Sequence, residues 1–394
     1  MKTKFLALAA ALAVAMPAWA QETVKIGIIT TLSGPQAGLG REMVDGFNLG
    51  VKHAGGRLGG APTEVLVGDD QFRPDTGKSV AERMVQRDRV DIVTGTVFSN
   101  ILLALSDTVL KDRRGAFLIN SNAGPSELAG KDCNPNFFSI SWQNDNTHEA
   151  MGQHMTNAGV KRVYLLAPNY PAGKDALAGF KRFYKGEIAG EVYTQLGQTD
   201  YAAEIATLRA AQPNATYFFY PGGMGIAFVR QYAQSGLMQQ VPLYGPSFSL
   251  DQTILPGIGD SAVGAYASTF WSEKLQNPAN ERFVRDFEAT YGRIPSPYAA
   301  QSYDSAMLID SALKATGGKL SSRADKNKFR DALRAANFAS VRGPFKFNHN
   351  HFPIQNYYLT QIAKDDKGRL VMDLRGVILS NHADAYADAC KMKW

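Results

Sequence analysis

The sequence is poor in the residue types from which metal and catalytic centres are built. Only two cysteines and six histidines occur in 394 residues. His349 and His351 are the one close histidine pair, and no third ligand candidate lies beside them, whereas a zinc site needs three or four ligands. No histidine stands in a pattern with an acid and a nucleophile that predicts a catalytic triad. We therefore expect no metal, no cofactor and no enzyme activity.

Complete nucleotide-binding motifs and basic stripes are absent as well. Gly38-Leu39-Gly40 follows a predicted strand, but the next residues are Arg, Glu and Met, so the third glycine of G-x-G-x-x-G is missing. Residues 74–78 contain Gly and Lys without the upstream glycine of a phosphate loop. Between residues 83 and 114 the basic side chains alternate with acidic ones, which is typical of a solvated helix face. The sequence thus argues against a dinucleotide site and predicts no nucleic-acid partner.

No apolar stretch after residue 20 is long enough to span a membrane, but the first twenty residues resemble a secretory signal. Lys2 and Lys4 precede the short apolar run 5–16, and Ala18-Trp19-Ala20 supplies the small residues of a cleavage site. We expect cleavage after Ala20 and a soluble exported protein. No cysteine follows the predicted cut, so nothing in the sequence indicates a lipid anchor.

Cys133 and Cys390 are the two cysteines of the chain. In an oxidising compartment an isolated pair forms a disulfide more often than a metal site. We predict that they are bonded, which would tie the C-terminal tail to the middle of the chain.

Two short apolar runs, each followed by a loop of small and polar residues, organise the first half of the chain. Residues 90–95 and 116–120 read as buried strands, and 101–110 between them has the apolar spacing of a helix. This order builds a parallel sheet, in which ligands bind beyond the carboxyl ends of the strands. The loops 96–100 and 121–125 would therefore face one cleft.

These two loops offer groups that bind an anion. Ser99 and Ser121 supply hydroxyls, Asn100 and Asn122 supply amides, and the helix that follows each strand begins with free N–H groups. No His, Cys, Lys or carboxylate pair accompanies them to activate a nucleophile. The alternative interpretation is that Ser99 and Ser121 are only helix N-caps.

The second half repeats the alternation of strands and helices without repeating the sequence. Aromatic residues follow its predicted strands at Tyr170, Tyr220 and Phe248. Each of them alone could belong to a lobe core, but three at successive strand ends fit the wall of a flat apolar ligand site. The pattern therefore predicts an α/β protein with two similar lobes.

Several short motifs, in their order and spacing, resemble the periplasmic solute-binding proteins of ABC transporters, in the type I leucine/isoleucine/valine-binding family. The resemblance is carried by the signal sequence, Lys25-Ile26-Gly27-Ile28, Leu32-Ser33-Gly34-Pro35, the loop at Ser99, Asn120-Ser121-Asn122-Ala123 and Ser302-Tyr303-Asp304. It covers essentially the whole mature chain.

The resemblance implies a two-lobed type I periplasmic binding fold, each lobe a mainly parallel sheet flanked by helices, with three interlobe crossings. By this division the first lobe comprises residues 21–142 and 271–341, and the second comprises 143–270 and 342–394. It also implies a monomer in the periplasm that closes around one small ligand and delivers it to the permease subunits of an ABC transporter.

The resemblance also assigns site residues. Ser99, followed by Asn100, matches the hydroxyl that binds the ligand carboxylate, and Ala123 with its neighbours matches the second carboxylate loop. Tyr170 matches the aromatic that covers the ligand. The ligand-binding residues expected in full are Leu39, Phe98, Ser99, Asn100, Asn122, Ala123, Tyr170, Tyr220, Ser247 and Phe248.

One departure from the family pattern bears on the ligand. Amino-acid binders place a Glu near Pro246-Ser247-Phe248 to pair the α-ammonium, and this chain has none there. A buried ammonium without a counter-charge is costly, so such a pocket should reject zwitterions. Residues 69–75, the loop at Ser99 and residues 351–356 resemble the branch that imports aromatic acids, which favours a benzoate or phenylpropenoate carboxylate, and Ser247 could select a ring hydroxyl.

Three alternatives stay open at this point. Asp251 or Asp304, displaced from the family position, could restore recognition of a branched-chain amino acid. The protein could present its ligand to a sensory receptor instead of a transporter. A secreted hydrolase using Ser99 or Ser121 is the third, although no G-x-S-x-G motif surrounds either serine.

Overall fold

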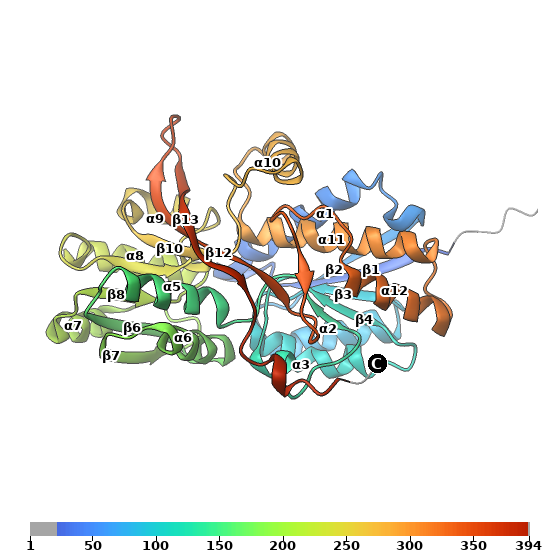
Figure 1. Cartoon of the computed structure of the whole chain (residues 1–394), viewed down its shortest axis with the longest axis horizontal. Helices are drawn as coiled ribbons and strands as arrows, with labels where there is room; N and C mark the ends of the chain where they lie inside the picture. Colours follow the sequence, from blue (N-terminus) through green and yellow to red (C-terminus); the bar gives the residue numbers. More distant parts are fainter. Residues whose placement is uncertain (1–21, 393–394) are drawn as a thin grey trace, which may run out of the picture.

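The computed structural model describes residues 22–392 as two α/β lobes side by side (Figure 1). The predicted signal sequence and its cleavage site lie outside the described residues. None of the helices in the described part of the chain combines the length and apolarity needed to cross a bilayer.

The first lobe is built on a five-stranded parallel sheet of order β2-β1-β3-β4-β5. Its strands are apolar and β-branched, and β3 and β4 are buried along their whole length, as expected for a parallel sheet covered on both faces. The strands are β1 (Val24–Thr30), β2 (Thr63–Asp69), β3 (Ile92–Gly95), β4 (Phe117–Asn120) and β5 (Phe137–Ser139).

Helices from both ends of the chain cover this sheet. They are α1 (Ala37–His53), α2 (Pro74–Gln86), α3 (Ser99–Leu110), α4 (Ser126–Ala129), α11 (Pro297–Thr316) and α12 (Arg323–Ala335), with α10 (Pro278–Tyr291) beside α1. Helix α1 packs directly against α11 (Figure 1). Gly46 permits this approach, because a Cβ there would lie 2.1 Å from the carbonyl oxygen of Ala299. The lobe is thus assembled from segments far apart in the sequence.

The second lobe has a larger mixed sheet of order β11-β12-β10-β9-β8-β6-β7, with β13 paired to β12. Strands β6 to β10 are parallel, whereas β11, β12 and β13 are antiparallel to their neighbours. The strands are β6 (Arg162–Pro168), β7 (Glu187–Thr194), β8 (Ala215–Phe218), β9 (Leu243–Pro246), β10 (Tyr266–Thr269), β11 (Lys346–Phe347), β12 (Pro353–Lys364) and β13 (Leu370–His382). The helices are α5 (Asn146–Asn157), α6 (Pro171–Phe183), α7 (Ala202–Ala211), α8 (Gly223–Gln234) and α9 (Leu255–Ile258).

The division of the chain at residues 142, 270 and 341 stays a proposal, and the last segment, residues 342–394, has contacts to both lobes. Phe347 packs on Phe138 with ring centroids 5.5 Å apart, and Phe352 packs on Phe137 at 5.8 Å. These contacts attach the segment around β11 to the first lobe, although β11 pairs with β12 of the second.

The C-terminal tail also returns to the first lobe. Cys390 and Cys133 form a disulfide, as the sequence predicts. The bond connects residues 257 positions apart, and in Figure 1 the red end of the chain lies close to α3.

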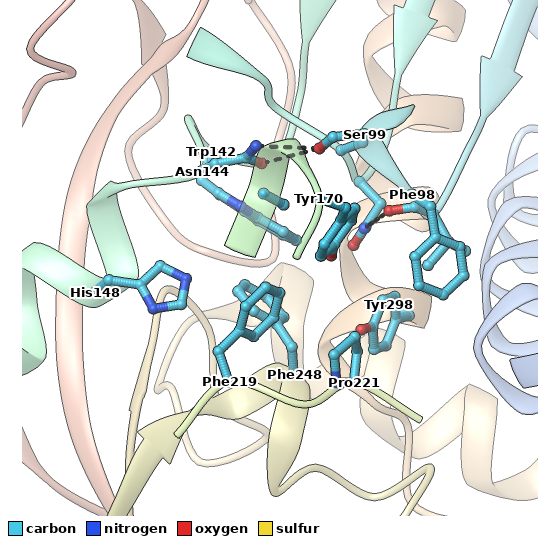
Figure 2. A pocket seen from close by; sticks show the side chains of 14 residues that line it. Phe98, Ser99, Trp142, Asn144, His148, Tyr170, Phe219, Pro221, Phe248 and Tyr298 are labelled. Atoms are coloured by element: carbon cyan, nitrogen blue, oxygen red, sulfur yellow. Dashed lines mark hydrogen bonds between the residues drawn. The ribbon is translucent and has the colours of Figure 1, made fainter. Parts of the chain in front are cut away.

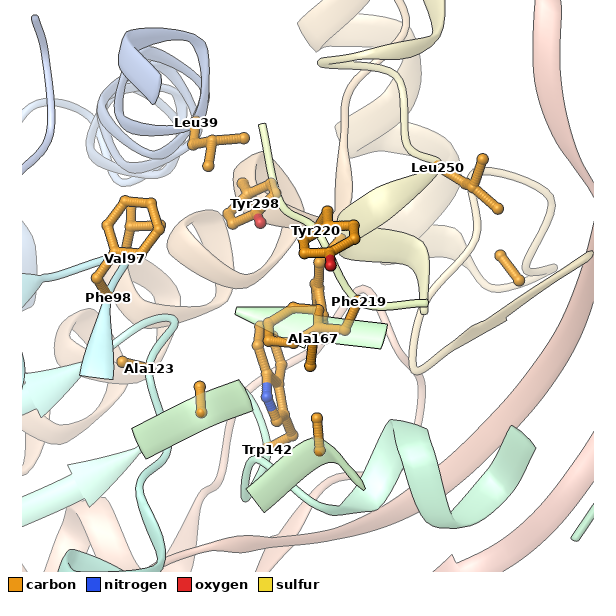
Figure 3. Close-up of a cluster of buried hydrophobic side chains, with 14 of the residues drawn as sticks. Leu39, Val97, Phe98, Ala123, Trp142, Ala167, Phe219, Tyr220, Leu250 and Tyr298 are labelled. Atoms are coloured by element: carbon orange, nitrogen blue, oxygen red, sulfur yellow. The ribbon is translucent and has the colours of Figure 1, made fainter. Parts of the chain in front are cut away.

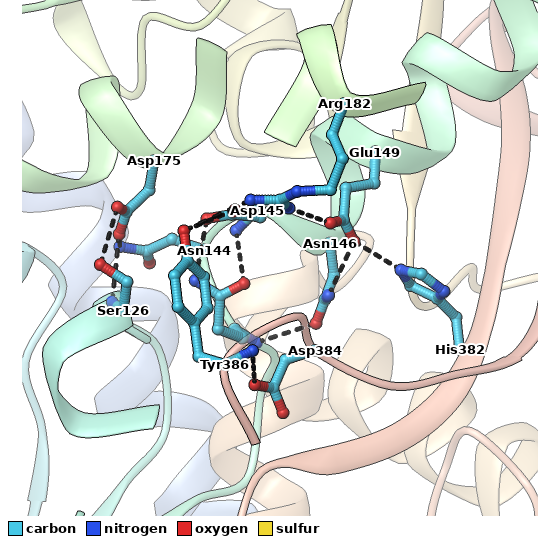
Figure 4. A network of polar contacts seen from close by, with 11 residues as sticks. Ser126, Asn144, Asp145, Asn146, Glu149, Asp175, Arg182, His382, Asp384 and Tyr386 are labelled. Atoms are coloured by element: carbon cyan, nitrogen blue, oxygen red, sulfur yellow. Dashed lines mark hydrogen bonds and ion pairs between the residues drawn. The ribbon is translucent and has the colours of Figure 1, made fainter. Parts of the chain in front are cut away.

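A network of charged side chains lies where the chain enters α5 (Figure 4). Arg182 pairs with both Asp145 and Glu149, and His382 bonds to Glu149. The hydroxyl of Tyr386 donates to Asp145 at 3.0 Å. The network joins α5, α6 and the C-terminal segment, and thereby fixes one crossing relative to the second lobe.

Candidate ligand-binding site

A cavity lies between the lobes at the carboxyl ends of their parallel strands (Figure 2). About 360 Å³ of space not occupied by atoms lies among its lining residues, part of it open to solvent. Its lining comprises Val97, Phe98, Ser99, Asn122, Ala123, Trp142, Asn144, His148, Tyr170, Ala172, Phe219, Pro221, Phe248 and Tyr298.

Ser99 faces this cavity with a hydroxyl that is not used as a helix cap. The chain turns sharply after β3, with φ of 100° at Gly95 and 61° at Thr96, and Phe98 takes the N-cap position of α3. Ser99 is therefore the first helical residue, and its Oγ accepts a hydrogen bond of 3.1 Å from Nδ2 of Asn144. The N-cap interpretation of Ser99 is wrong. Ser121 lies outside any helix, and its buried hydroxyl has no hydrogen-bond partner within residues 22–392.

The start of α3 adds two backbone donors. Within residues 22–392 no acceptor bonds the N–H of Ser99 or of Asn100, whereas Ile101 and Leu102 both donate to the carbonyl of Phe98. Free N–H groups and the helix dipole favour an anion at this position. Together with the Ser99 hydroxyl they are suited to a carboxylate.

Asn144 is the residue that organises the polar side of the cavity. Besides its bond to Ser99, its Nδ2 donates to Asp175 at 2.9 Å, and its Oδ1 accepts from the N–H of Gly124 at 3.0 Å. Asn144 thereby joins the loops after β3 and β4 to α6 of the second lobe.

The second predicted carboxylate loop has fewer free donors. Nδ2 of Asn122 donates to the carbonyl of Val97 at 2.7 Å, and its Oδ1 accepts from Gln301 at 2.6 Å. The N–H of Ala123 donates to the carbonyl of Thr96 at 3.2 Å. These bonds fix the loop, so Asn122 and Ala123 contribute shape to the cavity more than donors.

Aromatic rings form the opposite wall. Trp142 and Phe248 are stacked with centroids 4.3 Å apart, and Tyr170 and Phe219 face each other at 6.3 Å. These rings belong to one buried cluster that continues across both lobes (Figure 3). The wall is therefore suited to a flat apolar body.

Four of the ten residues expected at the site do not line the cavity. Tyr220 lies in the core of the second lobe, where its hydroxyl accepts from Thr194 and its ring packs on Tyr201. Ser247 is buried, and its hydroxyl bonds to nothing in the part of the chain that the structure describes. Asn100 points its amide oxygen into the protein. Leu39 lies against Gly222 where the two lobes meet, since a Cβ on that glycine would be 3.3 Å from its Cδ1.

Sequence reasoning missed other lining residues. Trp142 and Asn144 lie in the loop that follows β5, and this position after a strand could have marked them as lining residues. Phe219 lines the cavity where Tyr220 was expected, a displacement of one residue at the end of β8. His148 and Tyr298 lie on helices α5 and α11, and no local motif marks them.

The cavity lining contains no charged side chain. Asp304 is one of the two displaced acids considered above. Its carboxylate accepts hydrogen bonds from Arg342 at 3.0 Å, from the Ser340 hydroxyl at 2.6 Å and from the N–H of Val341 at 3.0 Å. The interpretation that Asp304 pairs a ligand ammonium is therefore wrong.

Asp251, the other acid, lies outside the cavity lining as well. It is fully buried, and its Oδ1 accepts from the N–H and hydroxyl of Thr253. Burial raises the pKa of Asp251 to about 7. A ligand ammonium in the cavity would thus meet no carboxylate among the lining residues.

His349 and His351, the one close histidine pair of the sequence, do not converge on a common point. His349 bonds through Nε2 to the carbonyl of Ala387 at 2.8 Å, whereas His351 stacks on Phe138 with centroids 3.8 Å apart. Among the described residues no three His, Cys, Asp or Glu side chains are grouped to hold a metal ion.

Comparisons with known proteins agree with this architecture. The sequence pattern of a family described as periplasmic binding protein matches residues 23–368. The Leu/Ile/Val-binding protein homolog 6 of Brucella melitensis is 26% identical over 357 residues, which cover 88% of this chain and 89% of that protein.

Two solved structures carry the comparison further. An ABC transporter solute-binding protein from R. palustris in complex with benzoate is 30% identical, with a TM-score of 0.88 over 94% of this chain and 100% of that one. A solute-binding protein from Rhodopseudomonas palustris BisB5 in complex with 3,4-dihydroxybenzoic acid is 28% identical, with a TM-score of 0.83 over 92% of this chain and 99% of that one.

Proposed function

Because the chain belongs to the periplasmic binding protein family and has its two-lobed type I fold, we propose that it binds a small aromatic carboxylate for an ABC importer. The family and fold are those of solute-binding proteins, which bind small ligands in the periplasm and work with membrane permeases. The aromatic carboxylate, of benzoate or phenylpropenoate type, is the part that needs a test.

The observation that carries the proposal is the composition of the cavity wall. It combines hydrogen-bond donors with aromatic rings and has no charged side chain. A carboxylate would accept from the Ser99 hydroxyl and the free N–H groups of α3, and an aromatic ring would lie against Trp142 and Phe248. Two structural relatives bound to benzoate and 3,4-dihydroxybenzoic acid support this ligand class.

We propose that the protein works by hinge closure, and contacts between the lobes support this mechanism. Ser126 donates to Asp175 at 3.0 Å, and the N–H of Gly223 donates to Gln36 at 3.1 Å. Each bond joins a residue of one lobe to a residue of the other. A ligand touched by both lobes favours the closed state by the contacts made only in that state.

A branched-chain amino acid is the second candidate, because the curated relative is named a Leu/Ile/Val-binding protein homolog. The absence of a carboxylate from the lining argues against it, since an unpaired ammonium in a closed cavity costs several kcal/mol, on the order expected for a buried ion.

Presentation of the ligand to a sensory receptor uses the same closed state. We further propose that the protein acts as a monomer in the periplasm and has no enzyme activity.

Thermal unfolding of the purified mature protein against benzoate, 4-hydroxybenzoate, cinnamate, leucine and valine tests the proposal. A ligand at about 100 times its Kd should stabilise the fold by ~2.7 kcal/mol, which is visible as a rise in Tm. We expect a rise with the aromatic acids only. A rise with leucine or valine alone would replace the proposed ligand class by amino acids.

A further inference from the structure

His148 and Tyr217 form a buried pair behind the cavity wall. His148 lies on α5, Tyr217 lies on β8, and Nδ1 of the imidazole is hydrogen-bonded to the tyrosine hydroxyl. Both side chains are almost completely inaccessible to solvent. Phe180 stacks on Tyr217 at 4.3 Å, and the edge of His148 meets Phe219 at 5.0 Å, so the pair is held in an apolar surrounding.

The pair fixes which imidazole nitrogen carries the proton. The Tyr217 hydroxyl has no other hydrogen-bond partner among the described residues, so its proton is satisfied only if it donates to Nδ1 of His148. The opposite arrangement would leave a buried O–H without an acceptor, at a cost of about 1–3 kcal/mol. Burial lowers the pKa of His148 to about 3, so the ring is neutral. A neutral ring that accepts at Nδ1 carries its proton on Nε2.

The Nε2–H group is therefore a donor at the cavity. His148 is one of the lining residues, and Figure 2 places it on the side of the cavity away from Phe98 and Ser99. No described residue accepts a hydrogen bond from Nε2. Asn144 and Ser99 bond to each other on the other side, so the cavity presents polar groups at two separate places.

We propose that His148 recognises a hydrogen-bond acceptor on the ring of the ligand, so that the protein selects hydroxylated aromatic carboxylates over unsubstituted ones. The inference rests on the proposed function and specifies its substrate class. The carboxylate would bind at Ser99 and the start of α3, while a phenolic oxygen accepts from Nε2–H. An amino group of the same size and position would be disfavoured, because it presents N–H groups to a donor.

Calorimetric titration with near-isosteric ligands tests this assignment. The ligands are benzoate and its 3- and 4-substituted hydroxyl, amino and methyl derivatives. For at least one ring position we expect the hydroxyl derivative to bind about tenfold more tightly than the amino and methyl derivatives, the effect of one buried hydrogen bond. Equal affinities, or a preference for the amino derivative, would overturn the proposal.

Two substitutions at His148 form a matched pair. In His148→Asn the amide replaces the Nδ1 side of the ring and can keep the bond to Tyr217, but the donor toward the cavity is lost. In His148→Gln the amide reaches the Nε2 position and keeps a donor there. We expect the preference for hydroxyl to disappear in His148→Asn and to persist in His148→Gln. A preference that survives in His148→Asn would overturn the role of Nε2.

Tyr217→Phe provides a second, independent measurement. It removes the hydroxyl that sets the imidazole proton, so discrimination between hydroxyl and amino derivatives should fall while benzoate still binds. Unchanged discrimination would contradict the role of the Tyr217 hydroxyl in fixing the imidazole proton on Nε2. If the wild-type protein binds benzoate but shows no preference among its derivatives, the inference fails and the proposed function stands. If it binds no aromatic carboxylate, both fail.

Discussion

The chain buries charged groups between its lobes but leaves them out of the cavity. Arg342 and Asp304 are paired at 3.0 Å and are almost fully buried, and Arg182 joins Asp145 and Glu149 at another junction (Figure 4). The cavity is lined by neutral side chains alone. The junctions between the lobes therefore bury charges as ion pairs, whereas the cavity buries neutral groups only.

The difference follows from whether a partner is always present in each region. The paired charges are partners in every molecule, so their desolvation is offset permanently by ion pairs and hydrogen bonds. A fixed charge in the cavity would lack a partner whenever the ligand is absent. Neutral donors such as the Ser99 hydroxyl and the N–H groups of α3 cost less free energy than a charge when no ligand is bound. They can still bind a ligand that brings its own negative charge.

Removing one partner of the buried pair should have the largest effect. Arg342→Met leaves the Asp304 carboxylate without a cation and removes the bond from Arg342 to Gln355 at 2.8 Å. We expect the free energy of unfolding to fall by about 3–5 kcal/mol, the usual cost of breaking a buried ion pair. Urea unfolding followed by circular dichroism measures this change.

The double variant Arg342→Met with Asp304→Asn is the matched control for that experiment. It removes both charges, so it should recover a large part of the stability lost in the single variant. A single variant as stable as the double one would mean that the pair is not the reason for the loss.

Removing a neutral donor from the cavity should weaken binding without unfolding the protein. Ser99→Ala deletes the hydroxyl expected to bind the carboxylate, and we expect a loss of about 1.5–3 kcal/mol in binding free energy, the range for hydrogen bonds to charged groups. Isothermal titration with the aromatic acid that gives the largest rise in Tm measures it.

Ser121→Ala is the control for Ser99→Ala. Ser121 occupies the equivalent loop after β4, but its hydroxyl is fully buried, has no partner among the described side chains and backbone groups, and does not line the cavity. Affinity should therefore stay within about twofold of the wild type, the scatter expected for a residue without ligand contact. Equal losses in the two variants would remove Ser99 from the site.

The fold was largely predictable from the sequence because local patterns and tertiary packing agree. The apolar runs before residues 95 and 120 form β3 and β4, and the helix predicted over 101–110 forms most of α3. Helix α12 (Arg323–Ala335) was missed, because only Phe329 and Leu333 among its residues are buried and its surface is strongly charged. Residues 74–78, which lack the pattern of a phosphate loop, open helix α2, with Pro74 in its first turn.

The site was predictable only where it follows a strand end. Ser99, Phe98 and Phe248 stand at such positions and line the cavity. His148 lies in the middle of a helix, where its spacing cannot be distinguished from that of a core residue. Its relation to the cavity arises from the packing of α5 against the second sheet, which no local sequence pattern encodes.

Asp251 is a third case, because it is a buried acid that lies neither in the ion-paired clusters nor in the cavity lining. It has no cation beside it, and its Oδ2 has no hydrogen-bond partner among the described residues. Burial raises its pKa from the ordinary value of 3.8 to about 7. Between these two pH values the folded state holds a proton that the unfolded state has released, so this group's contribution to stability decreases as pH rises through 7.

Asp251→Asn should remove this contribution. Between pH 5.5 and pH 8, a folded-state pKa of about 7 accounts for a fall of about 2 kcal/mol in the free energy of unfolding. The wild type should thus lose stability over this interval, and the Asn variant should lose less by about that amount. Asp70 and Glu273, whose pKa values burial also raises, titrate equally in both proteins and cancel in the difference.

Asp107→Asn is the control for the pH experiment, because Asp107 is a solvent-exposed acid on α3 with its side chain 74% accessible. Its pH dependence should follow that of the wild type. If Asp251→Asn follows the wild type as well, the Asp251 carboxyl is not the group that titrates. A buried acid can then remain ionised in this fold without a cation, and the absence of charge from the cavity would no longer argue against a zwitterionic ligand.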